Sequence, residues 1–302
     1  MAIVVTGASG FIGRAVVSRL LADGERVVAV DRRPSRTQPH PALAVLQADL
    51  TTDTLARGVL ADADAVIHLA GCPGVRDTAA DVAWRRHRDN VLATAAVLDA
   101  VQPDTPVVVA SSSSVYGGSS GRPSAETDPL RPLGGYARSK ATAEALCAHA
   151  LARGGVVATA RPFTVVGEHQ RPDMALAKWL ADARAGRPLR VLGGLDRTRD
   201  LTDVRDVARA LVALARRGAR GPVNVGTGRA VTLREMVDAV GAACGIDVEV
   251  VVTAAAALEP AATLADTRRL VALTGVAPWT DLADVTARLV AAAEPLPERL
   301  AS

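Results

Sequence analysis

Short apolar runs alternate with helical segments through more than half of this 302-residue chain, and this alternation most constrains its fold. Runs such as AIVVTG, RVVAVD and PVVVASSS are rich in Val and Ala and are typical of buried strands. Between them lie segments with apolar residues at helical spacing, such as GRAVVSRLLADG, which ends in a helix-stopping glycine. Strands separated by helices form βαβ units and a parallel sheet covered on both faces. The sequence therefore predicts an α/β fold, a doubly wound parallel sheet of the Rossmann type.

The alternation loosens after Gly167, which predicts a second, smaller α/β part. Segment 168–200 mixes one helix with turns, and residues 229 onward form small helices and one strand, DVEVVV. Between them, VRDVARALVALARRG and GPVNVGTG predict a helix and a strand that return to the main sheet. We predict a nucleotide-binding domain of residues 1–166 with 202–227, and a C-terminal substrate-binding part of residues 167–201 with 228–302.

Charge and cysteine usage argue against several kinds of partner. The formal charge of +3 comes from 35 basic and 32 acidic residues spread along the chain, whereas nucleic-acid binding needs a concentrated basic face. Cys72, Cys147 and Cys244 form no CxxC pair, and the five histidines lack metal-binding spacing, so we expect no disulfide and no metal. The chain shows no signal peptide and no long apolar run. We therefore expect a cytoplasmic protein with no membrane partner.

A glycine-rich turn, TGASGFIG, joins the first predicted strand to the first helix. Gly7, Gly10 and Gly13 follow a GxxGxxG spacing, which permits a tight turn and close approach of the backbone to a pyrophosphate. The N-terminus of the first helix favours an anion at the same place. A turn of this kind also occurs for purely structural reasons, so it indicates a dinucleotide site only in combination with an acidic residue at the end of the second strand.

Asp31 ends the second predicted strand at about the distance from the glycines expected of the acid that binds a ribose 2′-hydroxyl. The alternative is a simple strand-end turn residue. Arg32 and Arg33 come directly after it and favour a 2′-phosphate instead, as in NADP. Because Asp31 would repel that phosphate, the sequence favours NAD over NADP.

Two polar motifs carry the candidate chemistry. SSSSVYGG, residues 111–118, comes after an apolar strand, and YARSK places Tyr136 and Lys140 on one face of a helix start. The pKa of tyrosine, about 10, is too high for a base at neutral pH, and a neighbouring ammonium group lowers it. Tyr136 is thus a candidate proton acceptor for an alcohol undergoing oxidation.

These motifs occur together in the order that is typical of one family. TGxxGxxG, Asp31, ADL with Asp49, HLAG, Asn90, the serine strand ending in VYG, YxxxK and RPF resemble the extended short-chain dehydrogenase/reductases over essentially the whole chain. The resemblance implies that the catalytic Ser lies four residues before Tyr116, which is Ser112, with Ser111 supporting it. The resemblance further implies these cofactor-binding residues: Gly7, Ser9, Gly10, Phe11, Ile12, Gly13, Asp31, Arg32, Asp49, Leu50, Leu69, Ala70, Gly71, Asn90, Tyr136, Lys140 and Pro162.

Within the family, the residues after Ser112 separate the subgroups. Hexose 4,6-dehydratases carry an Asp–Glu pair there to eliminate water, whereas this chain has Ser113 and Ser114. RPFTVVGEHQRPDM and GCPGVRDT, which contains Arg76, resemble segments of UDP-glucuronate 4-epimerases. Hydroxyl groups of Ser113, Ser114 and Thr164 would bind a sugar carboxylate, and the lack of a strong cation there would avoid promoting decarboxylation.

The residues expected to bind the nucleotide part of the substrate depart from the family pattern. Arg199 matches the arginine that contacts the diphosphate, but the second such arginine is replaced by Ala256. Family tyrosines are also replaced, by Val166 and Asp203. Loss of one charge-assisted contact costs about 1.5–3 kcal/mol. We therefore expect either a different mode of nucleotide binding or a substrate other than an ordinary UDP-sugar.

The resemblance favours an NAD-dependent nucleotide-sugar 4-epimerase, acting on a UDP-hexuronate or UDP-hexose through a 4-keto intermediate. Ser112, Tyr136 and Lys140 would be catalytic, and Arg76, Ser112, Ser113, Ser114, Thr164 and Arg199 would bind substrate. A nucleotide-4-ketosugar reductase using NAD(P)H is the alternative, and a non-catalytic dinucleotide-binding scaffold is a second. Helix 81–101 and the helix after Tyr136 resemble those that pair in family dimers, so we expect a homodimer.

Overall fold

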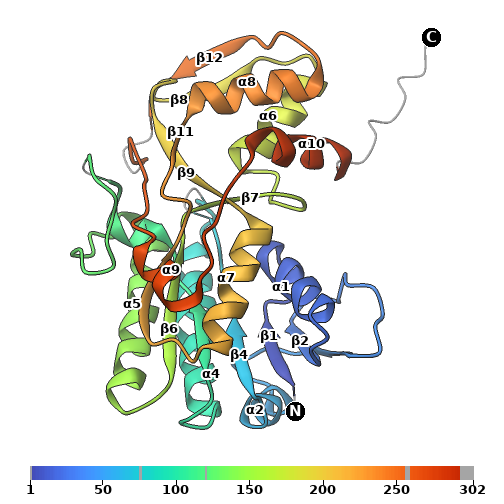
Figure 1. Ribbon diagram of the computed structural model, residues 1–302, viewed down its shortest axis with the longest axis vertical. Coiled ribbons are helices and arrows are strands. Elements are labelled where there is room, and N and C mark those ends of the chain that lie inside the picture. Colours follow the sequence, from blue (N-terminus) through green and yellow to red (C-terminus); the bar gives the residue numbers. More distant parts are fainter. Residues whose placement is uncertain (1, 75–76, 120, 256–258, 293–302) are drawn as a thin grey trace.

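A computed structural model of the chain describes residues 2–74, 77–119, 121–255 and 259–292 (Figure 1). Its main sheet has seven parallel strands in the order β10-β6-β5-β4-β1-β2-β3, which confirms the predicted doubly wound fold. The strands are β1 (Ile3–Thr6), β2 (Val27–Asp31), β3 (Leu43–Gln47), β4 (Ala65–His68), β5 (Val107–Ala110), β6 (Val157–Pro162) and β10 (Gly221–Val225).

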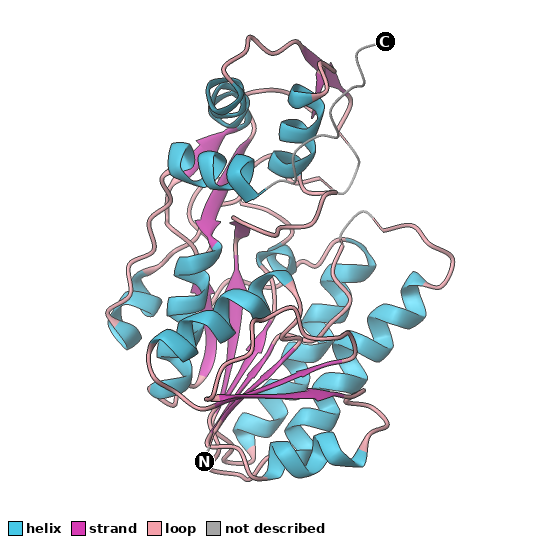
Figure 2. Cartoon of the chain, turned by 90° about the vertical axis from the view of Figure 1, so that its right-hand side faces the viewer, coloured by secondary structure: helices cyan, strands magenta, loops and turns pink. Residues whose placement is uncertain are grey.

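Helices cover both faces of this sheet, as Figure 2 shows. One face packs against α1 (Phe11–Ala22), α7 (Val204–Arg216) and α9 (Arg268–Thr274), and the other against α2 (Thr54–Ala61), α4 (Ala93–Ala100) and α5 (Gly134–Ala152). Successive strand residues alternate between the two cores: Val5 belongs to the first and Val4 to the second. Burial on both faces explains the nearly continuous apolar strands.

A smaller part lies above the carboxyl ends of these strands in Figure 1. It contains a three-stranded sheet of order β11-β9-β7 and a two-stranded sheet, β12-β8, around its own apolar core. Its elements are β7 (Thr164–Val166), α6 (Ala175–Arg184), β8 (Leu189–Leu192), β9 (Thr198–Asp203), β11 (Ala230–Thr232), α8 (Leu233–Cys244), β12 (Val250–Thr253) and α10 (Leu282–Ala292).

Three details differ from the sequence-based expectation. The predicted strand VVATARPFTVVG is two strands, because Phe163 bonds to β10 through its backbone while β7 turns to pair with β9. The predicted helix 81–101 is divided into α3 (Val82–Arg86), a π-helical turn η1 (His87–Leu92) and α4. Strands β8, β9 and β11 were not predicted, since they are short and their apolar runs are brief.

The proposed division into two parts stays a prediction, and packing would place two elements differently. β7, inside the predicted segment 1–166, pairs with the small sheet. Conversely, α9 lies beside α7 in Figure 1 and also contacts β10, and its Leu270 is fully buried in the core of the main sheet. A boundary drawn by packing therefore gives β7 to the smaller part and α9 to the larger one.

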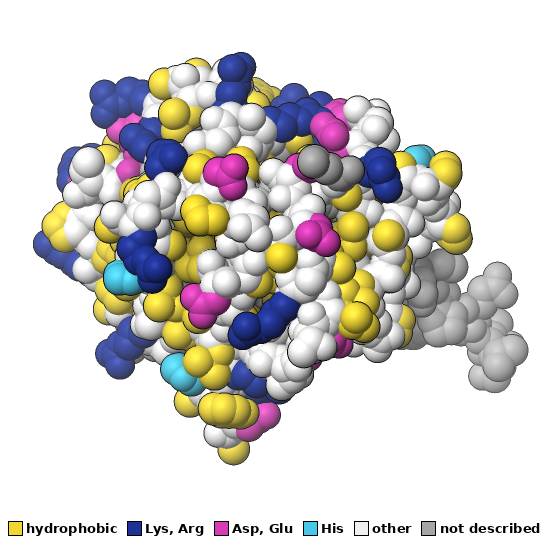
Figure 3. Space-filling model, turned by 90° about the horizontal axis from the view of Figure 1, so that it is seen from below, with side chains coloured by type: hydrophobic (Ala, Val, Ile, Leu, Met, Phe, Trp, Pro, Cys, Tyr) yellow, Lys and Arg dark blue, Asp and Glu magenta, His cyan; other side chains and the backbone are white. Residues whose placement is uncertain are grey.

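No helix in the described ranges is long and apolar enough to cross a membrane. On the face drawn in Figure 3, basic side chains are interspersed with acidic and apolar ones. The positive charge on this face is therefore dispersed.

Candidate active site

The four serines lie at the carboxyl end of β5, and the structure gives them different partners. Ser111 is buried, and its Oγ donates to Oε1 of Glu144 at 2.5 Å. Ser112 precedes a 3₁₀ turn, η2 (Ser113–Tyr116), and its Oγ accepts from the backbone N–H of Ser114 at 3.2 Å. The side chain of Ser112 also hydrogen-bonds with that of Tyr136. Ser112 therefore faces the tyrosine, while Ser111 faces away into the protein.

Tyr136 and Lys140 lie in the first turns of α5, on its face toward β5. Enclosure of Tyr136 raises its pKa, and the hydrogen bond with Ser112 acts in the opposite direction. Lys140 is buried, and its Nζ donates to the carbonyl oxygen of Ala110 at 2.7 Å. Burial lowers the pKa of Lys140 to about 8. The predicted juxtaposition of Ser112, Tyr136 and Lys140 is present, but the charges that lower the pKa of Tyr136 come mainly from elsewhere.

Two arginines supply those charges, and sequence reasoning missed both. The positive charges of Arg171 and Arg86 each lower the pKa of Tyr136 against the effect of its enclosure. Arg171 belongs to the segment QRPDM and is ion-paired with Asp173. The expectation that no strong cation lies near C5 of the reacting sugar stays a prediction, although the charge of Arg171 acts on Tyr136. The spacing of the motif gave no sign that the charge of Arg171 would act on Tyr136.

The backbone around the glycine turn forms a concave surface, which we call the glycine cradle. Side chains in place of its glycines would fill this space. Gly7 has φ +67°, and a Cβ there would lie 2.5 Å from the backbone nitrogen of Ala70. A Cβ on Gly13 would overlap the carbonyl oxygen of Gly7. A Cβ on Gly71 would lie 2.6 Å from Oδ1 of Asn90 and 3.5 Å from Nζ of Lys140. The predicted cofactor residues of β1, β4 and α5 thus converge, and close backbone approach at the N-terminus of α1 fits a dinucleotide pyrophosphate.

Asp31 fixes the glycine turn from the end of β2. Its Oδ2 accepts from the backbone N–H of Ser9 at 2.9 Å, and its Oδ1 accepts from that of Arg33 at 2.9 Å. Oδ1 also accepts from Nε of Arg33 at 3.4 Å, whereas Oδ2 keeps a further acceptor site for a ribose hydroxyl. Arg32 pairs with Asp89 at 2.8 Å, so its charge is compensated. This carboxylate and the glycine cradle together fit NAD.

The remaining cofactor residues border the same edge of the sheet. Asp49 lies just after β3, and Thr51 donates to its Oδ1 through both backbone and side chain, while its neighbour Leu50 is buried. Oδ1 of Asn90 accepts from the backbone N–H of Cys72 at 2.8 Å, and its Nδ2 donates to Oγ of Ser139. Asn90 therefore links the loop after β4 to the helix that carries Tyr136. The other predicted residues here are Phe11 and Ile12 at the start of α1, Leu69 after β4, and Pro162 at the end of β6.

The predicted substrate residues come from three elements. Ser113 and Ser114 lie in η2, and in the described part of the chain Oγ of Ser114 is buried without a hydrogen-bond partner. Thr164 begins β7. Arg199 lies on β9, and its Nη2 pairs with Oε1 of Glu259 at 2.7 Å. Arg76 and Ala256 lie outside the described residues.

A buried polar network supports the serine strand and was not predicted. Glu144, on α5, pairs with Arg161 of β6 at 2.6 Å and accepts the hydrogen bond of Ser111. Nη1 of Arg161 donates to the hydroxyl of Tyr116 at 2.7 Å, and that hydroxyl donates to Oδ1 of Asn224 at 2.7 Å. Burial raises the pKa of Tyr116 to about 12, which keeps it protonated. The network joins residues far apart in sequence, so no local motif revealed it.

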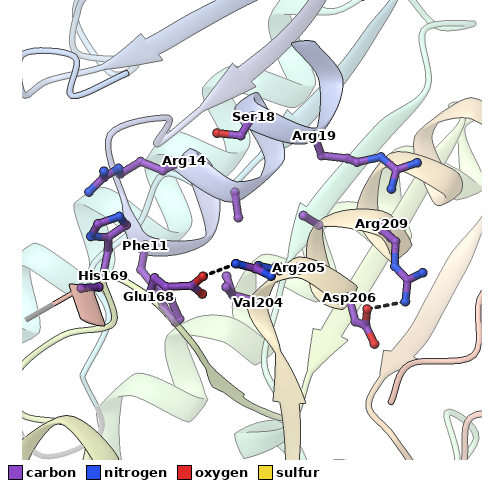
Figure 4. A pocket seen from close by; sticks show the side chains of 13 residues that line it. Phe11, Arg14, Ser18, Arg19, Glu168, His169, Val204, Arg205, Asp206 and Arg209 are labelled. Atoms are coloured by element: carbon purple, nitrogen blue, oxygen red, sulfur yellow. Dashed lines mark hydrogen bonds and ion pairs between the residues drawn. The ribbon is translucent and has the colours of Figure 1, made fainter. Parts of the chain in front are cut away.

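A cavity of about 650 Å³ lies elsewhere, between the outer faces of α1 and α7 and the loop at residues 168–169. In Figure 4 its side chains include Arg14 and His169 on one side and the Glu168–Arg205 pair in the middle. Phe11 is its one residue in common with the predicted site. The cavity is therefore separate from the Ser112–Tyr136 pair.

Comparisons with known proteins show which family the chain belongs to. The family model for the NAD dependent epimerase/dehydratase family matches residues 3–226. A probable UDP-glucuronate 4-epimerase of Rhizobium meliloti is 33% identical over 71% of this chain and 68% of its own length. The structure of MoeE5 in complex with UDP-glucuronic acid and NAD superposes with a TM-score of 0.87 at 36% identity, over 96% of this chain and 98% of that one. UDP-glucuronic acid 4-epimerase from Bacillus cereus, with UDP-glucuronic acid and NAD, gives 0.87 at 27% identity over 97% and 98%.

Proposed function

The chain belongs to the NAD dependent epimerase/dehydratase family, and from this premise we propose that it is an NAD-dependent nucleotide-sugar 4-epimerase. The observation that carries the proposal is the hydrogen-bonded pair of Ser112 and Tyr136, with Lys140 one helical turn away and the glycine cradle beside it. MoeE5 and the Bacillus cereus enzyme were solved with UDP-glucuronic acid and NAD, which favours a UDP-hexuronate as substrate and a UDP-hexose as the next choice.

The side chains perform proton transfer at C4 of the sugar. NAD, when bound, supplies the acceptor for the C4 hydride and returns it. Tyr136 accepts the proton of the C4 hydroxyl on its phenolate oxygen and gives it back to the other epimer. Ser112 donates a hydrogen bond to the same sugar oxygen. Arg171 and Arg86 favour the phenolate, as their charges lower the pKa of Tyr136. The 4-keto sugar must rotate between the two hydride transfers. It must therefore be held in the site through its nucleotide.

The sugar carboxylate would be bound by hydroxyl groups near η2. Oγ of Ser114 is buried and has no hydrogen-bond partner in the described residues, so it is free to donate to a bound group. Ser113 and Thr164 provide two more hydroxyl groups on adjoining elements. A carboxylate at C5 satisfies these donors better than a neutral hydroxymethyl group.

The ketosugar reductase is the weaker alternative. Its support comes from Arg32 and Arg33, which would bind the 2′-phosphate of NADP. Arg32 is paired with Asp89, and Nε of Arg33 lies 3.4 Å from Oδ1 of Asp31. Asp31 would also repel the phosphate. A non-catalytic scaffold is the second alternative. It would require neither Tyr136 nor its hydrogen bond with Ser112, so their presence disfavours it.

The decisive experiment measures both cofactor and product. The purified protein is denatured to identify released dinucleotide, and the native protein is incubated with UDP-glucuronate or UDP-glucose while the epimers are separated. We expect retained NAD, a mixture of C4 epimers and no net change in NADH absorbance. Tyr136→Phe should retain NAD and lose epimerisation. Net oxidation of added NADPH by a ketosugar would instead establish the reductase, and inactivity with bound NAD toward either sugar would leave the scaffold.

We also propose that the protein is a homodimer formed through α3, η1, α4 and α5. Trp84 on α3 is 58% exposed and Leu92 in η1 is 40% exposed, and large apolar side chains at such exposure favour an interface. Light scattering should give twice the mass of the chain, and Trp84→Glu should give the monomer. A monomeric wild-type protein would contradict this.

A cytoplasmic location is proposed from the thiols. Cys72, Cys147 and Cys244 are free, as expected in a reducing compartment. Fractionation of cells that express the protein would test this, and recovery outside the cytoplasm would contradict it.

A further inference from the structure

Arg32 directly follows Asp31 at the end of β2, but its guanidinium group pairs with two other carboxylates. Nη2 of Arg32 donates to Oδ2 of Asp89 at 2.8 Å, and its Nη1 lies 3.7 Å from Oδ2 of Asp49. The backbone carbonyl oxygen of Arg32 accepts from Nε2 of Gln47 at 3.0 Å, which ties the start of this loop to β3. Both terminal nitrogens of the guanidinium group are therefore engaged by acidic residues from other parts of the chain.

A second arginine completes this charge cluster, which consists of Arg32, Asp49, Arg88 and Asp89. Nε of Arg88 donates to Oδ1 of Asp89 at 2.9 Å, and its Nη2 lies 3.8 Å from Oδ2 of Asp49. Two arginines and two aspartates leave the cluster without net charge. Asp89 makes both short contacts, and its side chain is 10% exposed, whereas that of Arg32 is 44% exposed. Asp89 is thus the buried member of the cluster, and Arg32 lies at its accessible edge.

Asp89 reaches this position from the π-helical turn η1. Three consecutive residues of η1 have partners at the cofactor edge of the sheet: Arg88 and Asp89 belong to the charge cluster, and Asn90 bonds to Cys72 and Ser139. Consecutive residues of an ordinary α-helix point about 100° apart, so three of them do not share a face. π-helical turns are rare and occur frequently at functional sites. The turn therefore indicates that the place of Asp89 serves the cofactor site.

The pairing of Arg32 with Asp89 bears on the choice of dinucleotide. An arginine beside the adenosine ribose binds the 2′-phosphate of NADP through charge-assisted hydrogen bonds. In this structure the phosphate would meet the carboxylate of Asp31 and a cluster without net charge. To bind the phosphate, Arg32 would have to leave Asp89, and the buried carboxylate would then lose a short charge-assisted hydrogen bond.

We propose that Asp89 is a specificity-determining positioning residue, which disfavours NADP by holding Arg32 in the charge cluster. Asp31 repels the 2′-phosphate directly. Asp89 engages the cation that would otherwise compensate for that repulsion. The inference rests on the proposed function in its use of a dinucleotide, but it does not depend on the identity of the sugar.

The test measures which dinucleotide the protein holds. Each purified variant is equilibrated with a large excess of NAD and NADP in equal amounts, freed of unbound dinucleotide and denatured, and the released ratio of NADP to NAD is measured. Asp31→Asn is the background, because it removes the direct repulsion at nearly constant size. In this background we expect Asp89→Asn to raise the ratio by about a further 10- to 100-fold. Arg32→Gln, as a third substitution, should cancel that further rise.

Two more variants in the same background complete the design. With Asp89 intact, Arg32→Gln should leave the ratio nearly unchanged, and this arm does not require the Asp89 variant to fold. Asp64→Asn is the control for the loss of one negative charge, since Asp64 is exposed at the amino end of β4, away from the cofactor edge. It should also leave the ratio unchanged.

Four outcomes would overturn the inference. A ratio that Asp89→Asn does not raise would show that Asp89 does not keep Arg32 from the phosphate, and a rise that persists after Arg32→Gln would show that another cation binds it. A loss of both dinucleotides from the Asp89 variant, with a lowered melting temperature, would show a structural role. A wild-type protein that holds neither dinucleotide would contradict the NAD dependence of the proposed function, and the inference with it.

Discussion

Nζ of Lys140 donates a hydrogen bond to the carbonyl oxygen of Ala110 at 2.7 Å. This bond joins the first turns of α5 to the end of the strand that leads into Ser112. It holds the lysine inside the protein, where burial lowers its pKa to about 8. A buried ammonium group is costly to the fold below that pKa, so the position is optimised for function rather than for stability.

We predict that Lys140→Met abolishes epimerisation and stabilises the fold near neutral pH. The unfolded chain holds the lysine proton up to pH 10.5, whereas the folded protein releases it near pH 8. The wild type therefore bears the cost of the buried charge below pH 8, and this cost declines as pH rises from 8 toward 10.5. The gain of the variant should be about 1–3 kcal/mol at pH 7.

Urea unfolding of wild type and variant at pH 7 and pH 10 measures this effect. The gain should shrink at the higher pH. Lys178→Met, a substitution of an exposed lysine on α6, is the control and should change stability little at either pH. A gain that does not depend on pH would show that improved packing of methionine, and not the charge, is responsible.

Substitution of the two adjacent serines should affect two different properties of the protein, catalysis and stability. Ser112→Ala removes the hydroxyl that contacts Tyr136, and we expect kcat to fall by about 10²-fold with little change in stability. Ser111→Ala removes a buried partner of Glu144, so it should lower the free energy of unfolding by about 1–3 kcal/mol and retain most activity. Kinetics and unfolding of both variants would decide, and the opposite pattern would assign the catalytic role to Ser111.

Most of the catalytic chemistry could be predicted from sequence because its geometry is local. The glycine turn, the strand end at Ser112 and the helix face of Tyr136 and Lys140 each occupy a few consecutive residues. A parallel sheet brings successive strand ends to one edge, so these short motifs meet there. The assignment of NAD comes in the same way from Asp31 at the end of the next strand.

The parts that could not be predicted depend on long-range packing. Arg161 lies in an apolar strand as the one charged residue, and its partner Glu144 is on a helix that precedes that strand. Asn224 reaches Tyr116 across 108 residues. The approach of Arg171 to Tyr136 depends on how the loop after β7 folds. None of these contacts has a fixed sequence spacing, so a pattern search does not find them.

The buried pair of Glu144 and Arg161 gives a third prediction. Arg161→Met leaves the carboxylate of Glu144 without its cation inside the protein, and we expect it to destabilise the fold by about 3–5 kcal/mol. Adding Glu144→Leu removes that uncompensated charge, so the double variant should be more stable than Arg161→Met alone. Urea unfolding of the two variants measures the difference. A double variant that is less stable than the single one would show that Tyr116 and Ser111, which also lose partners, contribute more than the ion pair.

The last prediction concerns Arg86, which lies against the start of α5. It is buried, its Nη1 lies 2.9 Å from the place of a Cβ on Gly135, and its Nη2 donates to the carbonyl oxygen of Gly74 at 2.6 Å. Its charge lowers the pKa of Tyr136. Removal of that charge raises the pKa of Tyr136, so a larger fraction of the tyrosine is protonated at a given pH. The acid limb of kcat/KM should therefore move to higher pH in Arg86→Met.

Comparison of three variants separates the charge from the packing of Arg86. Arg86→Lys keeps the charge and should leave the acid limb near its wild-type position, even if the lost hydrogen bonds to the loop at residue 74 lower the melting temperature. Arg85→Met is the control, since the charge of the adjacent Arg85 is compensated by Asp77 and Asp81. An acid limb that moves equally in Arg86→Met and Arg86→Lys would mean that Arg86 acts by holding the loop in place, and that the phenolate is stabilised by Arg171 and Ser112.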